Sequence, residues 1–235
     1  MQKGIKDRLT TGILNLLYPS LCPVCAGPTD NLIYSPICRA CWNGMTRYDG
    51  PSCGICAAPL GSEHASVCTG CMKNRPGFTK AVSFGLYSGA LREAVHLLKF
   101  SGLKRLAAPL GGLLLGVDMP EADCIVPVPL EIIGLRARGF NQTFLIGRQI
   151  SKGRRIPLLA GALFKRRKTL PQVGLSAEER ALNLKGAFGV RGRLHGKRVL
   201  LLDDVMTTGA TARECTRELL NAGAEEVAVA VLARA

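Results

Sequence analysis

Apolar and polar residues alternate along the last two thirds of the chain with two different periods, one typical of strands and one of helices. Short apolar runs predict strands, and apolar residues that repeat every three to four positions predict helices. The predicted strands are residues 81–86, 124–126, 158–164, 199–202 and 226–232, and the predicted helices are residues 90–100, 103–117, 131–152 and 210–221. Residues 165–185 follow neither period and predict a long polar loop. This alternation predicts an α/β fold, with a parallel sheet and helices on both of its faces.

The most informative of these segments is the strand at residues 199–202, because two carboxylates and a loop rich in threonine follow it. Open α/β sheets bind ligands at the carboxyl ends of their strands. The carboxylates can accept hydrogen bonds from ribose hydroxyls, and the loop hydroxyls and N–H groups can surround a phosphate at a helix N-terminus. The predicted sugar-phosphate site comprises Asp203, Asp204, Thr207, Thr208, Gly209, Ala210 and Thr211.

A plain strand-to-helix turn capped by Asp and Thr is the alternative. It accounts for one carboxylate and one hydroxyl and leaves the second aspartate and the other hydroxyls unexplained. We therefore favour the sugar-phosphate interpretation.

Eight of the ten cysteines lie before residue 72, in four C-x-x-C pairs separated by twelve, eleven and eleven residues. Two such pairs can supply the four corners of a tetrahedral zinc site, so four pairs predict two zinc ions. Because sulfur fills every corner, both ions are expected to be structural. A sequential pairing is our preference, and an interleaved one would use the same ligands. These are Cys22, Cys25, Cys38, Cys41, Cys53, Cys56, Cys68 and Cys71.

The N-terminal segment bears on the choice between a zinc module and a disulfide framework, because disulfides are rare in reducing compartments. Residues 1–20 have helical apolar spacing, but Asn15 and Pro19 interrupt the apolar run, so an amphipathic helix is expected rather than a signal peptide. No apolar run approaches the roughly 18 to 20 residues of a membrane span. We therefore expect a cytoplasmic chain with this helix, a double zinc ribbon at 21–77 and an α/β domain at 78–235.

The formal net charge of +14 is concentrated in one segment. Residues 132–198 contain sixteen Lys or Arg and only two acidic residues, Glu178 and Glu179. A diphosphate needs only a few of these cations, so the surplus suggests a longer polyanion such as single-stranded DNA. A basic surface that serves only solubility is the alternative. Aromatic residues, 5% of the chain, are few for a protein that binds strands by base stacking.

Several short segments are similar to those of one family. Besides the cysteine pairs and the aspartate loop, they are LKFSG at 98–102, PVP at 127–129, RARGFNQ at 136–142 and GAF at 186–188. Together they resemble the ComF family, whose members join a double zinc ribbon to a type I phosphoribosyltransferase domain. The resemblance covers nearly the whole chain.

The resemblance implies a type I phosphoribosyltransferase fold that binds phosphoribosyl pyrophosphate (PRPP), or a related sugar phosphate, together with Mg²⁺. It further implies that Arg136 and Arg138 meet the pyrophosphate, and that a mobile loop closing over the site begins at the basic run Lys165, Arg166, Arg167 and Lys168. A solvated linker is the alternative for this loop. Some family members are needed for uptake of single-stranded DNA in transformation, which implies DNA and a competence helicase or DNA-processing protein as partners.

Three functions remain open on the sequence. The chain can handle single-stranded DNA and use PRPP, it can be a phosphoribosyltransferase with an unidentified nucleobase-like acceptor, or it can sense PRPP without turnover. After Thr211 the chain continues with Arg213 and Glu214, and no residue there is an obvious general base. The sequence therefore assigns no catalytic residue.

Overall fold

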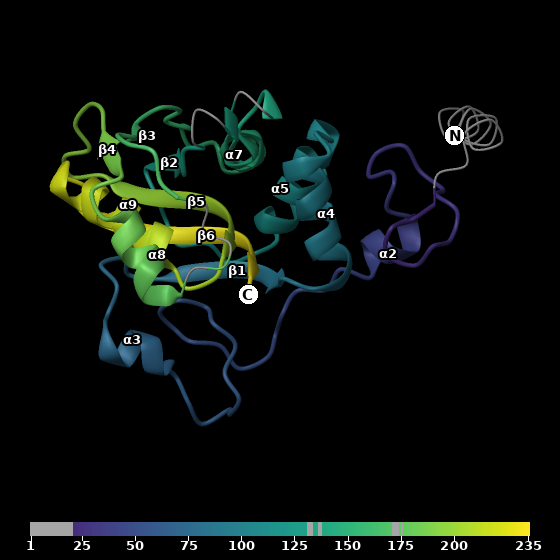
Figure 1. Cartoon of the computed structure of the whole chain (residues 1–235), viewed down its shortest axis with the longest axis horizontal. Coiled ribbons are helices and arrows are strands. Elements are labelled where there is room, and N and C mark those ends of the chain that lie inside the picture. The colour runs from purple at the N-terminus through teal and green to yellow at the C-terminus, as the bar shows by residue number, and fades with distance from the viewer. Residues whose placement is uncertain (1–20, 131–133, 136–137, 171–173, 175) are drawn as a thin grey trace.

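In the computed structural model, which describes residues 21–130, 134–135, 138–170, 174 and 176–235, a parallel sheet forms the centre of the molecule (Figure 1). Its four strands lie in the order β1, β6, β5, β2, and every neighbouring pair is parallel. They are β1 (Ala81–Leu86), β2 (Cys124–Pro127), β5 (Arg198–Met206) and β6 (Glu226–Arg234). The sheet confirms the predicted α/β class and brings the carboxyl ends of β5 and β2 side by side.

Helices cover both faces of this sheet. On one face lie α4 (Gly89–Phe100), the short 3₁₀ helix η1 (Lys104–Leu106), α5 (Ala107–Leu115) and α7 (Gln142–Arg154). On the other face lies α9 (Ala210–Asn221), with α8 (Ala177–Leu184) packed against it. A separate antiparallel pair, β3 (Leu163–Lys165) and β4 (Phe188–Val190), joins the core of the α9 face.

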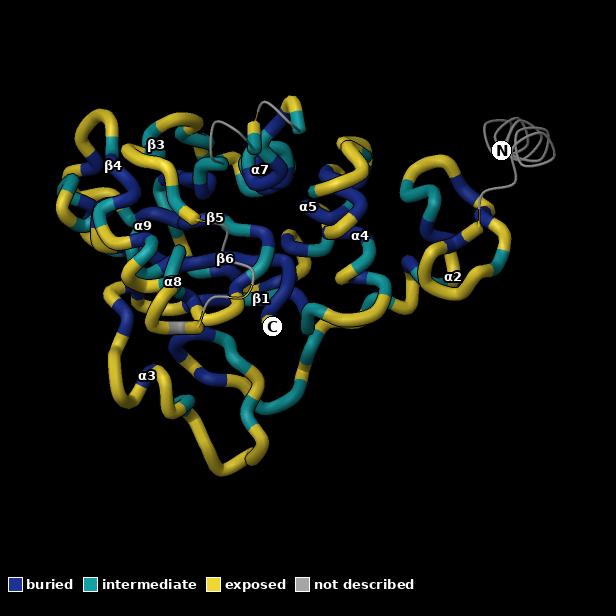
Figure 2. Tube along the Cα trace, in the orientation of Figure 1, coloured by how far each residue is buried: buried dark blue, intermediate teal, exposed yellow. Residues whose placement is uncertain are grey.

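Side-chain alternation along the strands divides the core into two halves. Leu200 and Leu202 of β5 pack on the α4, α5 and α7 side, whereas Val199 and Leu201 pack on the α9 side. All four side chains are fully buried, as expected for a parallel strand covered on both faces (Figure 2).

The two cysteine ribbons attach to opposite faces of the sheet. The first, with helix α2 (Arg39–Asn43), adds Ile37 and Trp42 to the core beside α4. The second, with helix α3 (Thr69–Lys73), adds Ile55 and Phe78 to the core beside α9. The chain between the two cysteine clusters therefore passes from one side of the sheet to the other before β1 begins.

Three details differ from the sequence-based expectations. The predicted strand at 158–164 is wrong as a sheet strand, because only Leu158 bridges to Ile125 and the chain then turns into β3. The predicted loop at 165–185 contains α8, whose start is fixed by a reciprocal capping box between Ser176 and Glu179. The strand β5 continues to Met206, so both aspartates lie inside it.

The predicted N-terminal helix at 1–20 lies outside the described residues, as do 131–133 and 136–137 of the predicted helix at 131–152. Where that second helix is described as α7, it starts at Gln142, and the Asn141 side chain caps it by accepting from the Thr143 N–H. Within the described part of the chain, no helix is both long and apolar enough to span a bilayer.

The contact between α5 and α7 depends on a glycine, and an adjacent glycine provides a control. A Cβ at Gly111 would lie 2.7 Å from the Cβ of Gln149, whereas a Cβ at Gly112 would meet nothing within 4 Å. We expect Gly111→Ala to lower the free energy of unfolding by about 1–3 kcal/mol through overpacking. Gly112→Ala should raise it by up to about 1 kcal/mol through helix propensity. Denaturant titration measures both, and equal effects would contradict the tight helix contact.

Candidate functional site

A cavity of 380 Å³ opens where β2 and β5 end. This is the edge of a parallel sheet at which α/β proteins bind their ligands. Its polar lining comes from α4, α7 and the segment before it, β3 and the segment after it, β5 and α9. The polar side chains that line it are Lys99, Arg138, Gln142, Thr143, Lys165, Thr169, Asp203, Asp204 and Thr211.

Asp204 is held inside the protein by two partners from different helices. Its side chain lies on the same face of β5 as Leu202, and it is only 4% exposed. The Lys99 ammonium of α4 lies 2.7 Å from Oδ1, and the Gln142 amide of α7 donates to Oδ2 at 2.7 Å. Burial by itself lowers the pKa of Lys99, but the Asp204 carboxylate outweighs burial and keeps that pKa above its usual value. Asp204 lines the cavity, but both of its oxygens already have partners in the protein, and its part in the predicted sugar-phosphate site stays a prediction.

Asp203 has the opposite environment, because the next position along a strand points to the other face. Its carboxylate accepts a hydrogen bond from the backbone N–H of Asp204 at 2.8 Å. Burial, and then the negative charge of Asp204, raise the pKa of Asp203 to about 7, and Lys99 opposes the rise. A carboxyl group that titrates near neutral pH at the edge of a cavity is typical of functional sites.

The loop after β5 turns sharply into α9. Gly209 adopts φ +78°, a left-handed conformation that glycine accepts without strain, and α9 starts at the next residue. Gly209 offers no side chain as a cap, so the first N–H groups of α9 face the loop, where Thr208 Oγ1 receives the Ala210 N–H at 3.4 Å. Thr207 Oγ1 accepts from Arg180 of α8 at 3.0 Å. Such an open helix N-terminus attracts anions.

Two of the predicted cations line the cavity. Arg138 lies 5.0 Å from the centre of the Phe100 ring and donates to Gln142 at 3.3 Å. Lys165 donates to Thr169 at 2.8 Å. Arg136, the other predicted pyrophosphate ligand, lies outside the described residues.

The other three cations of the basic run do not line this cavity. Arg166 pairs with Glu218 of α9 at 3.4 Å. Arg167 donates to the carbonyl of Asn183 at 2.9 Å, at the end of α8. Lys168 is exposed and contributes its backbone carbonyl to Arg167. Their role as a closing loop stays a prediction, and in this structure Arg166 and Arg167 tie the β3 segment to α9 and α8.

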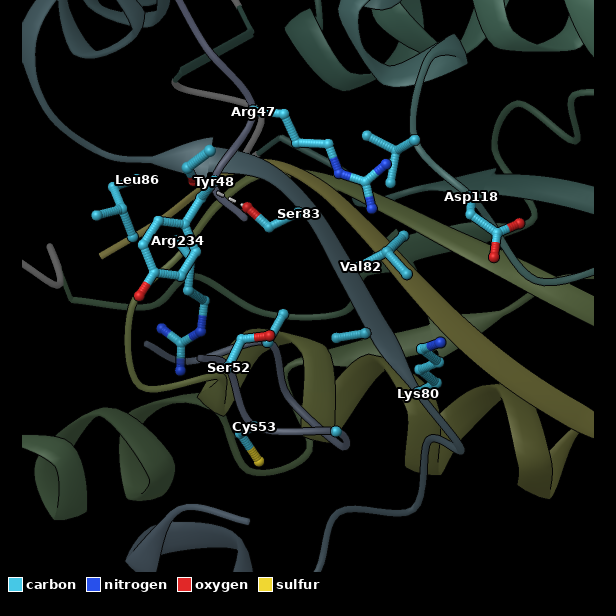
Figure 3. Close-up of a pocket in the computed structure, with 15 residues that line it drawn as sticks. Arg47, Tyr48, Ser52, Cys53, Lys80, Val82, Ser83, Leu86, Asp118 and Arg234 are labelled. Atoms are coloured by element: carbon cyan, nitrogen blue, oxygen red, sulfur yellow. Dashed lines mark hydrogen bonds between the residues drawn. The ribbon is translucent and has the colours of Figure 1, made fainter. Parts of the chain in front are cut away.

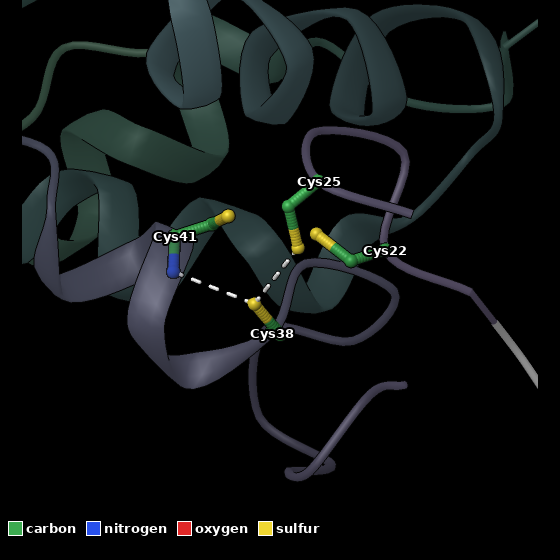
Figure 4. Close-up of side chains that lie close together, drawn as sticks. All are labelled: Cys22, Cys25, Cys38 and Cys41. Atoms are coloured by element: carbon green, nitrogen blue, oxygen red, sulfur yellow. Dashed lines mark hydrogen bonds between the residues drawn. The ribbon is translucent and has the colours of Figure 1, made fainter. Parts of the chain in front are cut away.

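The eight paired cysteines form two clusters, and in each the four sulfur atoms lie within 4.8 Å of one another (Figure 4 shows the first). The pairing is sequential, which resolves the alternative left open by the sequence. The first cluster is Cys22, Cys25, Cys38 and Cys41, and the second is Cys53, Cys56, Cys68 and Cys71.

The local geometry of the two clusters repeats and favours the thiolate form of one cysteine in each. Cys38 and Cys68 each cap a short helix and accept the N–H of the cysteine three residues later at 3.4 Å. Burial by itself raises the pKa of Cys22 and Cys53, but backbone N–H donors outweigh it and bring both to about 6. Four converging sulfurs with N–H donors fit zinc, and all four positions of each site are filled by protein. Zinc bound there supports the fold and activates no water.

Sequence reasoning missed Lys99 and Gln142 as partners of Asp204. Both lie in segments that carry the family resemblance, LKFSG and RARGFNQ, but neither segment reveals that its polar residue points at β5. Arg234 was also missed. Its side chain is buried between the second cysteine ribbon and the loop after β5, where it donates to Cys56 and Met206.

Comparisons with known proteins agree with this arrangement. A family model described as "Double zinc ribbon domain" matches residues 13–72, and one described as "Phosphoribosyl transferase domain" matches residues 164–235. Competence protein F of Haemophilus influenzae is 34% identical over 85% of this chain and 90% of its own. The DNA utilization protein YhgH of Escherichia coli is 34% identical over 93% and 99%. Competence protein ComFC of Bacillus subtilis is 26% identical over 80% and 79%.

The ion pair at the base of the cavity generates a stability prediction. Lys99→Met leaves the buried Asp204 carboxylate without its counterion, so we expect the free energy of unfolding at pH 7 to fall by about 3–5 kcal/mol. The double variant Lys99→Met with Asp204→Leu removes both charges and should recover most of that loss. Denaturant titration of the wild type, the single variant and the double variant measures both changes in the free energy of unfolding. A loss below about 1 kcal/mol in the single variant would mean that the pair acts like an exposed one.

Proposed function

The chain belongs to the ComF family, and from the geometry of its cavity we propose that it binds PRPP with Mg²⁺ and handles single-stranded DNA in the cytoplasm. The observation that carries the first half is the convergence at one sheet edge of a carboxylate, two cations and an open helix N-terminus. A sugar bearing a phosphate at one end and a diphosphate at the other needs this combination.

Each group in the cavity suits one part of PRPP. Asp203 accepts hydrogen bonds from ribose hydroxyls, since Asp204 is already engaged by Lys99 and Gln142. The loop 207–211 receives the 5′-phosphate at the start of α9. Arg138 and Lys165 neutralise the diphosphate. Mg²⁺ chelated by PRPP would add positive charge on the diphosphate as it leaves.

Turnover is a separate question, because the described residues supply no obvious general base. Glu214 accepts the Gly186 N–H at 2.6 Å and pairs with Arg217 at 2.6 Å, so its carboxylate is occupied. Electrostatic stabilisation of a departing diphosphate can by itself drive phosphoribosyl transfer. Release of pyrophosphate with candidate nucleobases would favour a phosphoribosyltransferase, and its absence with tight PRPP binding would favour a sensor.

The names of the relatives and the charge of the chain support the DNA half of the proposal. One relative, Competence protein F, is named for competence, and another, YhgH, is named for DNA utilization. In this chain, the basic segment 132–198 keeps many cations exposed to solvent, where they can meet phosphates. Among the described residues of this segment, the exposed cations are Arg148, Lys152, Arg155, Arg166, Arg167, Lys168, Lys185, Arg191, Arg193 and Lys197. A competence helicase or another DNA-processing protein is the partner that such a role would require.

Calorimetry with Mg²⁺-PRPP tests the proposed binding of PRPP. Asp203→Ala should abolish binding, and Arg138→Ala should weaken PRPP at least tenfold while affecting ribose 5-phosphate less. Ribose hydroxyls favour the carboxylate form of Asp203, whose pKa is about 7, so wild-type affinity should rise from pH 6 to pH 8. Arg193→Ala, an exposed cation that does not line the cavity, is the control. Unchanged affinity in folded Asp203→Ala would contradict the assignment.

Measuring the affinity for single-stranded DNA at increasing salt concentration tests the proposed DNA binding. Replacing Arg166, Arg167 and Lys168 together by Ala should weaken single-stranded DNA of every sequence about equally. The slope of log affinity against log salt should flatten by roughly two units, at about 0.7 per lost phosphate contact. A wild-type slope in this variant would show that the three cations do not touch the strand. Loss of PRPP affinity alone would assign them to a lid over the cavity and count against the DNA proposal.

A further inference from the structure

Arg234, the last residue of β6, joins two parts of the molecule that are far apart in sequence. Its side chain is buried, with 6% of the residue exposed. Nε donates to the carbonyl of Cys56 at 3.0 Å, and Nη2 lies 3.8 Å from the Cys56 sulfur. Nη1 donates to the carbonyls of Met206, at 2.6 Å, and Thr207. One guanidinium therefore contacts Cys56 of the second cysteine cluster and the start of the predicted phosphate-binding loop at 207–211, which we call the sugar-phosphate loop.

The position of the Arg234 side chain explains how it reaches both the second cysteine cluster and the loop after β5. Arg234 lines a cavity of 260 Å³ between the second ribbon and the edge of the sheet, together with Ser52 and Cys53 of the ribbon (Figure 3). β6 lies between β1 and β5, so its carboxyl end is next to the end of β5, where Met206 stands.

The charge of Arg234 needs a counterion. A buried guanidinium is unfavourable unless a negative group compensates it. Among the ion pairs of the described residues, none includes Arg234. The carbonyls of Cys56, Met206 and Thr207 are neutral, so they satisfy N–H groups but not the charge. Nη1 also donates to the oxygen of Ala235 at 2.8 Å. A zinc ion held by four thiolates carries a net charge of −2, and the Cys56 sulfur of that group lies 3.8 Å from Nη2 of the guanidinium.

The two carbonyls that Arg234 holds belong to the turn that shapes the predicted phosphate site. Met206 ends β5, Thr207 follows it, and Gly209 then turns the chain into α9. The Met206 carbonyl also accepts the Ala235 N–H at 3.1 Å. Releasing Arg234 would free the Thr207 peptide to rotate, and the loop hydroxyls and N–H groups would lose their fixed directions.

We propose that Arg234 is a positioning residue that couples the second zinc site to the sugar-phosphate loop. Zinc at Cys53, Cys56, Cys68 and Cys71 fixes Cys56, Cys56 orients Arg234, and Arg234 holds the backbone at 206–207. The first cluster packs on the opposite face of the sheet, and no hydrogen bond among the described residues joins it to the loop. The two zinc sites therefore have different roles, although their local geometry is the same.

Coupling between two sites is reciprocal at equilibrium. Loss of zinc from the second site should weaken PRPP by about 5-fold or more, and bound PRPP should tighten zinc at that site by the same factor. This consequence rests on the proposed function, whereas the effect of zinc on the loop itself does not.

Matched cysteine variants test the coupling without PRPP. Cys68→Ser and Cys38→Ser change equivalent helix-capping ligands in the second and first clusters. Metal analysis should show two zinc ions in the wild type and one in each variant. Hydrogen exchange of a peptide covering 203–213 should speed up at least 5-fold in Cys68→Ser and stay at the wild-type rate in Cys38→Ser. Equal exchange in the two variants would overturn the proposal.

Arg234 variants identify the carrier of the coupling. Arg234→Met should speed exchange of the same peptide and speed zinc release from one of the two sites to a chromogenic chelator. Arg234→Lys, which keeps the charge, should restore zinc retention more fully than loop protection. Arg47→Met is the control, because Arg47 lines the same cavity and its ion pair is with Asp49. Wild-type exchange and zinc release in folded Arg234→Met would overturn the assignment.

Calorimetry on the same proteins separates the two proposals. If the wild type fails to bind Mg²⁺-PRPP, the proposed function fails, and the exchange and zinc-release results still decide the coupling. If the wild type binds PRPP and Arg234→Met exchanges faster but keeps full affinity, the loop is coupled to zinc but does not hold the ligand, and the positioning role is refuted.

Discussion

Side-chain alternation along β5 is the constraint on which the site depends. The strand is buried on both faces, so each successive residue must suit one of two different cores. From Val199 to Leu202, apolar side chains meet this demand. The next two positions carry carboxylates, and alternation sends them to opposite faces, Asp204 towards α4 and α7 and Asp203 towards the α9 side. Two neighbouring acidic residues thereby acquire different environments and different roles.

The different environments separate the chemistry of the two carboxylates. Asp204 has one partner on each oxygen, Lys99 and Gln142, so it anchors two helices to the sheet at the base of the cavity. Burial is the main cause that raises the pKa of Asp203 to about 7, and the negative charge of the neighbouring Asp204 adds to the rise. The Asp204 carboxylate therefore stabilises the site, and the Asp203 carboxylate can respond to a ligand or a proton.

The zinc ribbons extend the same division of the sheet. Each ribbon places apolar residues in the core of one face, so the ribbons are built into the α/β domain instead of forming an independent appendage. The boundary at residue 77 separates sequence patterns, but the second ribbon and the domain share Phe78 and the Ala81–Ile55 backbone hydrogen bond at 2.7 Å. Metal binding in a ribbon is therefore expected to stabilise residues that also belong to the core of the α/β domain.

The sequence by itself determined the features that depend on local spacing. Apolar runs located β1, β2, β5 and β6, because a strand buried on both faces permits little else. The C-x-x-C pairs identified all eight sulfur ligands, since two thiolates three residues apart already form half of a tetrahedron. The capping box of α8 was present at Ser176 and Glu179 but was overlooked within a polar stretch.

Tertiary structure alone decided which distant polar groups meet. Lys99 and Asp204 are more than one hundred residues apart, and Cys56 and Arg234 are 178 apart. Their pairing depends on strand order and on which helix covers which face, and neither is encoded in the local pattern. The sequence predicted a sugar-phosphate loop from its residue types. The fold decided that one aspartate supports it from inside, and that an arginine from β6 holds its backbone against the second ribbon.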